Sequence, residues 1–252
     1  MRHTHWLTMG KFRNRIKKSA KQSRIILAND YPTSTPKLEE KTIRNIKTLS
    51  DYICGIKLNF HLLLPLGKKE IKRITKTAHD VGIQTIADIK LNDIGNTNIV
   101  TSENLYELGF DALIANPIMG PDALGKLVGF GHKYGNGVIT LCHMSAPEAK
   151  LSYELKIKSM SKNKQLYQLF LDWAISSRVD GIIVGATYPK IISHCKNTAK
   201  NKLSIFSPGV GTQGGSASKA KKLGSDFLIV GRTILNSKVP VDIAKKIHLI
   251  PS

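Results

Sequence analysis

Short apolar segments and amphipathic segments alternate eight times along this chain, and this alternation restricts the folds that the chain can adopt. The apolar segments are four to eight residues long, as expected for strands of a parallel sheet that is covered on both faces. Apolar residues at helical spacing follow each of these segments. The predicted strands cover residues 25–28, 52–57, 83–90, 112–115, 138–142, 181–184, 203–206 and 227–230.

Eight strand–helix units within about 230 residues fit a closed (β/α)8 barrel, the TIM barrel. An open doubly wound sheet is the competing architecture, and it favours a G-x-G-x-x-G turn after the first strand. The segment after Leu27 has no such glycines. We therefore expect a single α/β domain, a (β/α)8 barrel over residues 23–252, with a basic and flexible N-terminal extension over residues 1–22.

The positive charge of the chain raises the question of whether it binds nucleic acids. The formal net charge is +20, but outside one dense run at residues 11–24 the lysines are scattered and are not interleaved with aromatic residues. This pattern does not favour nucleic-acid binding. No apolar run approaches the roughly 20 residues of a membrane span. The three cysteines are far apart and form no C-x-x-C pair, which indicates reduced thiols and a cytoplasmic protein.

The active site of such a barrel lies at the C-terminal ends of its strands. A barrel built only for stability has no need for many ionisable groups at one mouth. Polar or charged residues nevertheless follow the predicted strands, namely Asp30, Lys57, Asp88 with Lys90 and Asp93, Asn116, Ser145, Thr187, Ser207 and Arg232. We therefore expect an active site at this mouth.

Two carboxylates and an ammonium group are concentrated at the end of the third strand. Strand geometry sends Asp88 and Lys90 to the same face, and Asp93 follows where the strand gives way to a loop. Taken alone, this cluster could be an ordinary ion pair at a strand end. Its position among the other polar strand ends favours a catalytic function.

Two late segments predict a phosphate site. Residues 207–215, Ser-Pro-Gly-Val-Gly-Thr-Gln-Gly-Gly, link the seventh strand to a helix, and their glycines allow the backbone to approach a ligand closely. Gly231 and Arg232 end the eighth strand with a backbone N–H and a guanidinium group. Either segment alone could be a glycine-rich turn. On adjacent strands, at the usual phosphate site of this fold, they predict a phosphorylated small molecule as ligand.

These motifs together resemble the orotidine 5′-monophosphate decarboxylase family, over residues 24–250. The D-x-K-x-x-D pattern alone is shared with related sugar-phosphate decarboxylases, whereas the Pro-Gly-Val-Gly-x-Gln-Gly-Gly loop is more specific to the orotidine enzymes. The resemblance rests on Leu27-Ala28-Asn29-Asp30, Ile56-Lys57, Asp88 to Ile94, Met144-Ser145, Gly185-Ala186-Thr187, Pro208 to Gly215 and Val230-Gly231-Arg232.

This resemblance implies decarboxylation of orotidine 5′-monophosphate (OMP) to uridine 5′-monophosphate (UMP), the last step of de novo UMP synthesis, without a metal or a cofactor. By similarity, the catalytic residues are Lys90, the proton donor, with Asp88, Asp93 and Lys57. The implied substrate-binding residues are Asp30 and Thr97 at the ribose, Ser145 at the pyrimidine, Pro208, and Gln213, Gly231 and Arg232 at the phosphate. The resemblance also implies a homodimer in which Asp93 and Thr97 contribute to the neighbouring site.

Five positions depart from the family pattern. Asn59, Asn116, Ala146, Glu148 and Tyr188 stand where Gly, His, His, Gly and Arg, respectively, are common. None of them removes a predicted catalytic group. Asn116, Ala146, Glu148 and Tyr188 bear on the closure of the loop after the fifth strand.

Two alternative functions fit part of the pattern. A Mg²⁺-dependent sugar-phosphate decarboxylase or aldolase of the same suprafamily would need carboxylate ligands, usually a Glu and an Asp, near the strand ends. Glu70 and Glu103 instead fall within predicted helices. A non-catalytic barrel that binds nucleotides or RNA would exploit the positive charge, but the scattered lysines and the complete set of acid–base residues argue against it.

Overall fold

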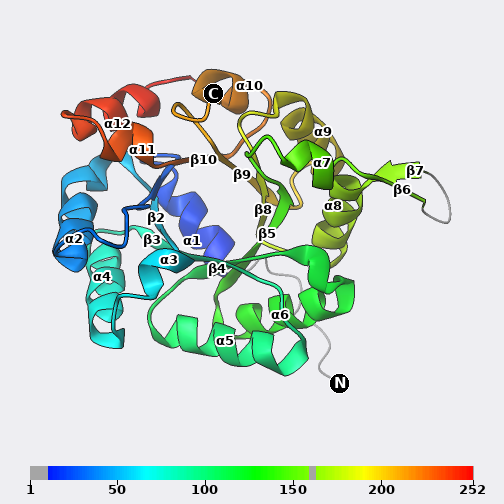
Figure 1. The fold of residues 1–252 in the computed structure, drawn as a ribbon, viewed down its shortest axis with the longest axis horizontal. Coiled ribbons are helices and arrows are strands. Elements are labelled where there is room, and N and C mark those ends of the chain that lie inside the picture. The colour runs from blue at the N-terminus through cyan, green and yellow to red at the C-terminus, as the bar shows by residue number, and fades with distance from the viewer. Residues whose placement is uncertain (1–10, 159–162, 252) are drawn as a thin grey trace.

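The computed structural model describes residues 11–158 and 163–251, and this part of the chain contains a closed barrel of eight parallel strands surrounded by helices (Figure 1). Strand β10 pairs with β1 and closes the barrel. The predicted (β/α)8 barrel is therefore confirmed. The barrel strands are β1 (Ile25–Ala28), β2 (Gly55–Asn59), β3 (Gln84–Leu91), β4 (Ala112–Ala115), β5 (Gly137–His143), β8 (Gly181–Val184), β9 (Ser204–Pro208) and β10 (Phe227–Val230).

Helices cover the outside of the barrel, and their apolar faces pack against the strands. The longer helices are α1 (Lys11–Ser19), α2 (Leu38–Leu49), α4 (Lys68–Asp80), α5 (Gly95–Glu107), α6 (Pro121–Tyr134), α8 (Leu166–Ser176), α9 (Pro189–Ala199) and α12 (Pro240–His248). The shorter ones are α3 (Phe60–Leu63), α7 (Ala149–Ser152), α10 (Ala217–Lys222), α11 (Arg232–Leu235), and the 3-10 helices η1 (Ser50–Tyr52) and η2 (Pro117–Met119). Within the described residues, no helix is long and apolar enough to cross a bilayer.

A small antiparallel hairpin, β6 (Lys156–Lys158) with β7 (Asn163–Gln165), follows α7 and extends away from the barrel in Figure 1. The sequence did not predict it. Its strands are three residues long and contain no buried residue, so they lack the apolar run that identifies the barrel strands.

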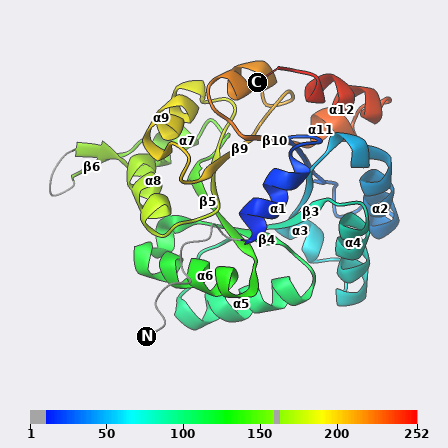
Figure 2. The ribbon, with the colours of Figure 1, turned by 180° about the vertical axis from the view of Figure 1, so that it is seen from behind.

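Helix α1 lies across the N-terminal end of the barrel, the end that faces the viewer in Figure 2. Phe12 and Ile16 are buried, and a Cβ added at Gly137 would collide with the Phe12 ring. Arg15 donates hydrogen bonds to the Gly135 carbonyl (2.9 Å) and to Asp111 (2.9 Å). We predicted a flexible leader over residues 1–22. Residues 11–19 instead form this packed helix, because their two large apolar residues share one helical face; residues 1–10 lie outside the described part.

Replacing Phe12 with alanine is expected to lower the free energy of unfolding by about 3–5 kcal/mol, because a fully buried aromatic ring is removed from the barrel floor. Urea unfolding measures this loss. Lys18→Ala, on the exposed side of the same helix, is the matched control. Equal stability of the two variants would show that the helix does not contribute to the barrel.

Candidate active site

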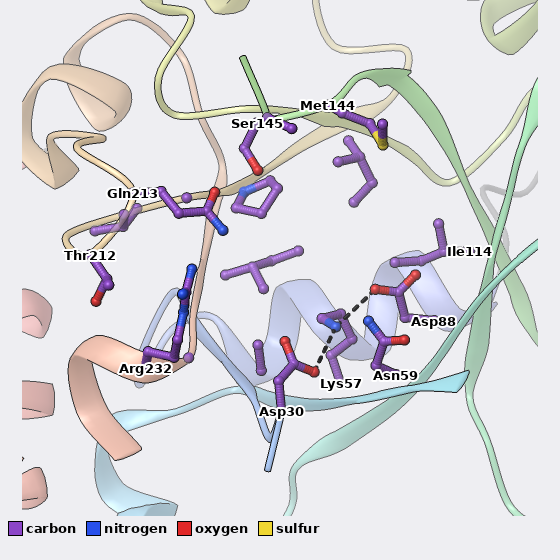
Figure 3. A pocket seen from close by; sticks show the side chains of 18 of the residues that line it. Asp30, Lys57, Asn59, Asp88, Ile114, Met144, Ser145, Thr212, Gln213 and Arg232 are labelled. Carbon is purple, nitrogen blue, oxygen red and sulfur yellow. Dashed lines mark hydrogen bonds and ion pairs between the residues drawn. The ribbon is translucent and has the colours of Figure 1, made fainter. Parts of the chain in front are cut away.

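A pocket of about 250 Å³ opens at the C-terminal end of the barrel (Figure 3). All eight barrel strands, or the segments that directly follow them, contribute to its lining. Apolar side chains that line it include Ile114, Leu141, Ile183 and Ile229. Figure 3 shows Lys57 and Asp88 on one side of the pocket, and Gln213 and Arg232 on the opposite side.

Four ionisable side chains form an alternating chain of charges on the first side of the pocket. Lys57 Nζ lies 2.8 Å from Asp88 Oδ2 and 3.3 Å from Asp30 Oδ1. Lys90 Nζ lies 2.9 Å from Asp88 Oδ1. The Lys57 and Asp88 side chains are 6% and 9% exposed, whereas that of Lys90 is 39% exposed. Lys90 is therefore the cation of this network that a ligand can reach.

Burial and ion pairing oppose each other at the two buried groups. Burial alone would lower the pKa of Lys57, but the carboxylates of Asp88 and Asp30 outweigh it, so this pKa lies above its ordinary value. Burial alone would raise the pKa of Asp88, but Lys57 and Lys90 hold this pKa below its ordinary value. Lys57 and Asp88 are therefore both charged near neutral pH.

The backbone of Lys90 differs from that of a regular strand. Its φ is 46°, in the left-handed region, and the pairing of β3 with β4 shifts register between Ala87 and Leu91. The predicted contact between Asp88 and Lys90 is confirmed. The local irregularity of β3 contributes to it, in addition to the alternation of side chains along a strand. Left-handed backbone at a residue other than glycine is strained, and such strain is common at functional sites.

Lys57→Ala is expected to lower the free energy of unfolding by about 3 kcal/mol at pH 7, because it leaves the buried Asp88 carboxylate without its closest partner. Since the pKa of folded Asp88 is lowered, its ion pairs contribute stability above the unfolded pKa of about 4, and this contribution is lost as the pH falls through the folded value. The difference between wild type and variant should therefore shrink at low pH. Urea unfolding at several pH values tests this, with the exposed Lys68→Ala as control; a pH-independent difference would contradict it.

The glycine-rich loop lies on the other side of the pocket. Gly209 and Gly211 have φ values of 90° and 76°, which other residues rarely adopt. A Cβ at Gly215 would lie only 2.5 Å from the Gly209 carbonyl oxygen, so this turn requires glycine there. Thr233 Oγ1 donates to the Val210 carbonyl (3.0 Å) and thereby joins the loop to the segment after β10. Gln213 and Arg232 are exposed residues of these two segments and line the pocket.

The structure brings most of the predicted site residues together. The residues that line the pocket as predicted are Asp30, Lys57, Asp88, Lys90, Ser145, Pro208, Gln213, Gly231 and Arg232. Asp93 and Thr97 are exposed and are not among the residues of the described chain that line it. Asp93 Oδ1 instead accepts a hydrogen bond from the Ile94 N–H (2.6 Å) at the start of α5.

Several lining residues were not predicted as site residues, among them Asn59, Met144, Thr212 and Thr233. Asn59 and Met144 lie within two residues of the predicted site residues Lys57 and Ser145. Their position at the end of a strand could therefore have identified them from the sequence. Within the described residues, no three His, Cys, Asp or Glu side chains are grouped as metal ligands. Both Asp88 oxygens already face ammonium groups.

Several known proteins are similar to this chain in sequence and in fold. Residues 23–247 match the orotidine 5′-phosphate decarboxylase / HUMPS family. The chain is 31% identical, over 227 residues, to the orotidine 5′-phosphate decarboxylase of Methanococcoides burtonii, which covers 90% of this chain and 96% of that protein. The crystal structure of the Pyrococcus horikoshii enzyme aligns with a TM-score of 0.71 and 31% identity over 89% of this chain and 97% of that one.

A further structural relative was solved with a ligand. It is the Methanocaldococcus jannaschii orotidine 5′-monophosphate decarboxylase complexed with inhibitor BMP, and it aligns with a TM-score of 0.77 and 25% identity over 92% of this chain and 100% of that one. These matches span nearly the whole length of both partners, and they agree with the pocket geometry. This chain belongs to the orotidine 5′-phosphate decarboxylase / HUMPS family.

Proposed function

We propose that this protein decarboxylates OMP to UMP without a metal or a cofactor. The observation that carries the proposal is the Lys57–Asp88–Lys90 chain, buried at Lys57 and Asp88 and exposed to the pocket at Lys90, with Gln213 and Arg232 on the other side of the pocket. This arrangement suits a ligand with a reacting carboxylate at one end and a phosphate at the other. The relatives named above carry the same activity in their names, which supports the proposal.

Lys90 is the residue that acts on the reacting carbon in this proposal. Loss of CO2 from C6 of the pyrimidine leaves negative charge on a carbon that has no electron sink of its own. The Lys90 ammonium is held by Asp88 at 2.9 Å and is partly exposed to the pocket, so it can stabilise this charge and then donate a proton to C6. The product is UMP, and the second product is CO2.

Asp88 and Lys57 fix the charge of the site. A carboxylate at Asp88 would face the substrate carboxylate, and two unit charges about 4 Å apart interact by roughly 4 kcal/mol at an effective dielectric constant near 20. This repulsion is relieved as CO2 leaves, although Lys90 has the larger part in catalysis. The Lys57 ammonium lies within 3.3 Å of Asp30 and 2.8 Å of Asp88, and its charge offsets the charges of these two neighbouring carboxylates.

The remaining pocket residues bind parts of the substrate that do not react. Arg232 has a guanidinium group that can hold phosphate oxygens, and Gln213 can donate to the same group. Asp30 would accept from ribose hydroxyls, and Ser145 would bind the pyrimidine. Phosphate binding far from C6 supplies energy that can close loops around the reacting end.

The proposal includes a homodimer in which Asp93 and Thr97 serve the neighbouring site. Both residues are exposed in the single chain, next to α5. Ile94, at 79% exposed, and Ile118, at 57% exposed, lie on adjoining segments, since Asn98 of α5 donates to Met119 Sδ of η2 at 3.4 Å. Large exposed apolar residues of this kind are typical of an interface.

We also infer a cytoplasmic location and no nucleic-acid partner. The three cysteines are free and buried, which suits a reducing compartment. The lysines are spread over the sequence and do not form a basic stripe with aromatic residues.

Incubation of EDTA-treated protein with OMP tests the proposed function. We expect the pyrimidine absorbance to change with time at the rate of untreated protein, because the charged groups that act on C6 belong to the chain itself. A Mg²⁺-dependent relative would lose its activity with EDTA and regain it with Mg²⁺. Absence of turnover, with or without added Mg²⁺, would show that the proposed substrate is wrong.

A further inference from the structure

Three consecutive carbonyl groups after β5 are each held by a side chain. Residues 144–147, which we call the Ser145 loop, follow β5. Met144, Ser145 and Ala146 line the pocket, and Met144 and Ser145 lie at its upper side in Figure 3. The carbonyl oxygens of residues 144–146 face, in order, His143 Nδ1 (2.9 Å), Thr187 Oγ1 (3.0 Å) and Tyr188 Oη (2.8 Å). A carbonyl oxygen only accepts, so all three side chains donate, and the Nδ1 atom of His143 carries a proton.

The donors themselves are held firmly. His143 is fully buried, and its ring centroid lies 4.2 Å from that of Tyr188, with Tyr153 and Tyr167 at 5.5 and 5.9 Å. The Gly185 N–H, just before Thr187, donates to the His143 carbonyl (3.0 Å). The segment after β8 is therefore bonded to the end of β5 and to the Ser145 loop.

The segment after β8 and the Ser145 loop approach each other so closely that only glycine fits at the point of contact. A Cβ at Gly185 would lie 2.5 Å from Ser145 Cα, and a Cβ at Gly209 would lie 2.9 Å from Ser145 Cβ. Ser145 is thus set between the segments that follow β8 and β9. Small movements of its backbone would move its hydroxyl relative to the pocket.

We propose that Thr187 and Tyr188 are positioning residues that hold Ser145 in place to recognise the base of the nucleotide. The inference rests on the proposed function, in which Ser145 binds the pyrimidine. Neither Thr187 nor Tyr188 lines the pocket, so they act on the ligand only through the Ser145 loop. Their side chains donate to carbonyls of residues 145–147 and form no hydrogen bond with Gln213 or Arg232 at the phosphate end, although Gln213 itself lies beside Ser145 in Figure 3.

This role accounts for Tyr188, which departs from the family pattern. Its ring packs on His143, and its hydroxyl donates to the Ala146 carbonyl. Tyr188 therefore contacts both the buried histidine and the backbone of the Ser145 loop. Phenylalanine at this position would keep the ring contact and lose only the hydrogen bonds of the hydroxyl to the Ala146 (2.8 Å) and Pro147 (3.4 Å) carbonyls of the loop.

The test compares two ligands that differ in the base. UMP carries the pyrimidine, and ribose 5-phosphate carries only the sugar and the phosphate. For Tyr188→Phe we expect the dissociation constant of UMP, measured by calorimetry, to rise about fivefold, as for the loss of a hydrogen-bonded hydroxyl. The constant for ribose 5-phosphate should not change. Thr187→Val should behave in the same way, and Tyr153→Phe, in the same aromatic cluster, should change neither constant.

A double-mutant cycle with Ser145→Ala separates positioning from general stability. If Tyr188 acts through Ser145, adding Tyr188→Phe to Ser145→Ala should change UMP binding by less than about twofold, whatever the effect on melting temperature. Additive effects, or an equal loss for both ligands, would overturn the positioning role. Wild-type protein that binds UMP but does not decarboxylate OMP would contradict the proposed function alone, whereas failure to bind UMP would contradict both proposals.

Discussion

Lys90→Ala is expected to lower the rate of OMP decarboxylation by at least about 10³-fold, because one ammonium group both stabilises the charge at C6 and delivers the proton. The structure shows no second cation in the same position within the described residues, since Lys57 is buried between Asp30 and Asp88. UMP lacks the reacting carboxylate and already carries the C6 proton. The variant should therefore still bind UMP, and steady-state kinetics together with calorimetry can separate the two effects.

The backbone of Lys90 suggests the best control for this experiment. Because its φ is 46°, Lys90→Gly removes the side chain without forcing another non-glycine residue into the left-handed region. Both variants should lose activity to the same extent, while Lys68→Ala, on the surface, should keep it. Near-native turnover by either Lys90 variant would show that the proton comes from another group.

Mixing two inactive variants is expected to restore activity, because each site needs residues from both subunits of the proposed homodimer. Asp93→Asn should inactivate the neighbouring site, and Lys90→Ala should inactivate its own. In a hybrid dimer, one site combines the intact Lys90 of one chain with the intact Asp93 of the other. After random exchange of equal amounts, half of the dimers are hybrid and half of their sites are intact, so about a quarter of the wild-type activity should return.

Subunit exchange must be demonstrated independently, for example by mass spectrometry of differently tagged chains. Mixing Lys90→Ala with Asp88→Asn is the matched negative control, because both residues line the pocket of their own chain. Recovery in the control mixture as well, or no recovery in the first mixture despite exchange, would show that Asp93 does not act across an interface.

The barrel could be predicted from the sequence because its strands are buried on both faces. Residues 112–115 and 181–184 are continuous apolar runs, and the structure gives both strands these bounds. Other strands extend further into polar residues, such as Asn59 and His143, where hydropathy gives no signal. Helix α1 was missed because Phe12 and Ile16 are surrounded by basic residues, and only the barrel floor shows where they pack.

The sequence predicts those pocket residues that lie at the ends of the predicted strands. Asp88 and Lys90 were placed together by strand alternation, but the left-handed backbone of Lys90 has no counterpart in the sequence pattern. The hydrogen bonds of Thr187 and Tyr188 to the Ser145 loop also could not be predicted, because they join segments that lie 42 residues apart in the chain. The positions of Asp93 and Thr97 relative to a second subunit stay a prediction.

The central claim is that Lys90 protonates C6 as CO2 leaves, and decarboxylation in D2O tests it most directly. The protein should convert OMP to UMP with release of one CO2 per UMP, and NMR of the product should show deuterium at C6. Lys90→Gly should form neither product at a measurable rate. If the wild-type protein left OMP intact, or if Lys90→Gly formed C6-deuterated UMP at the wild-type rate, the account of this site would be wrong.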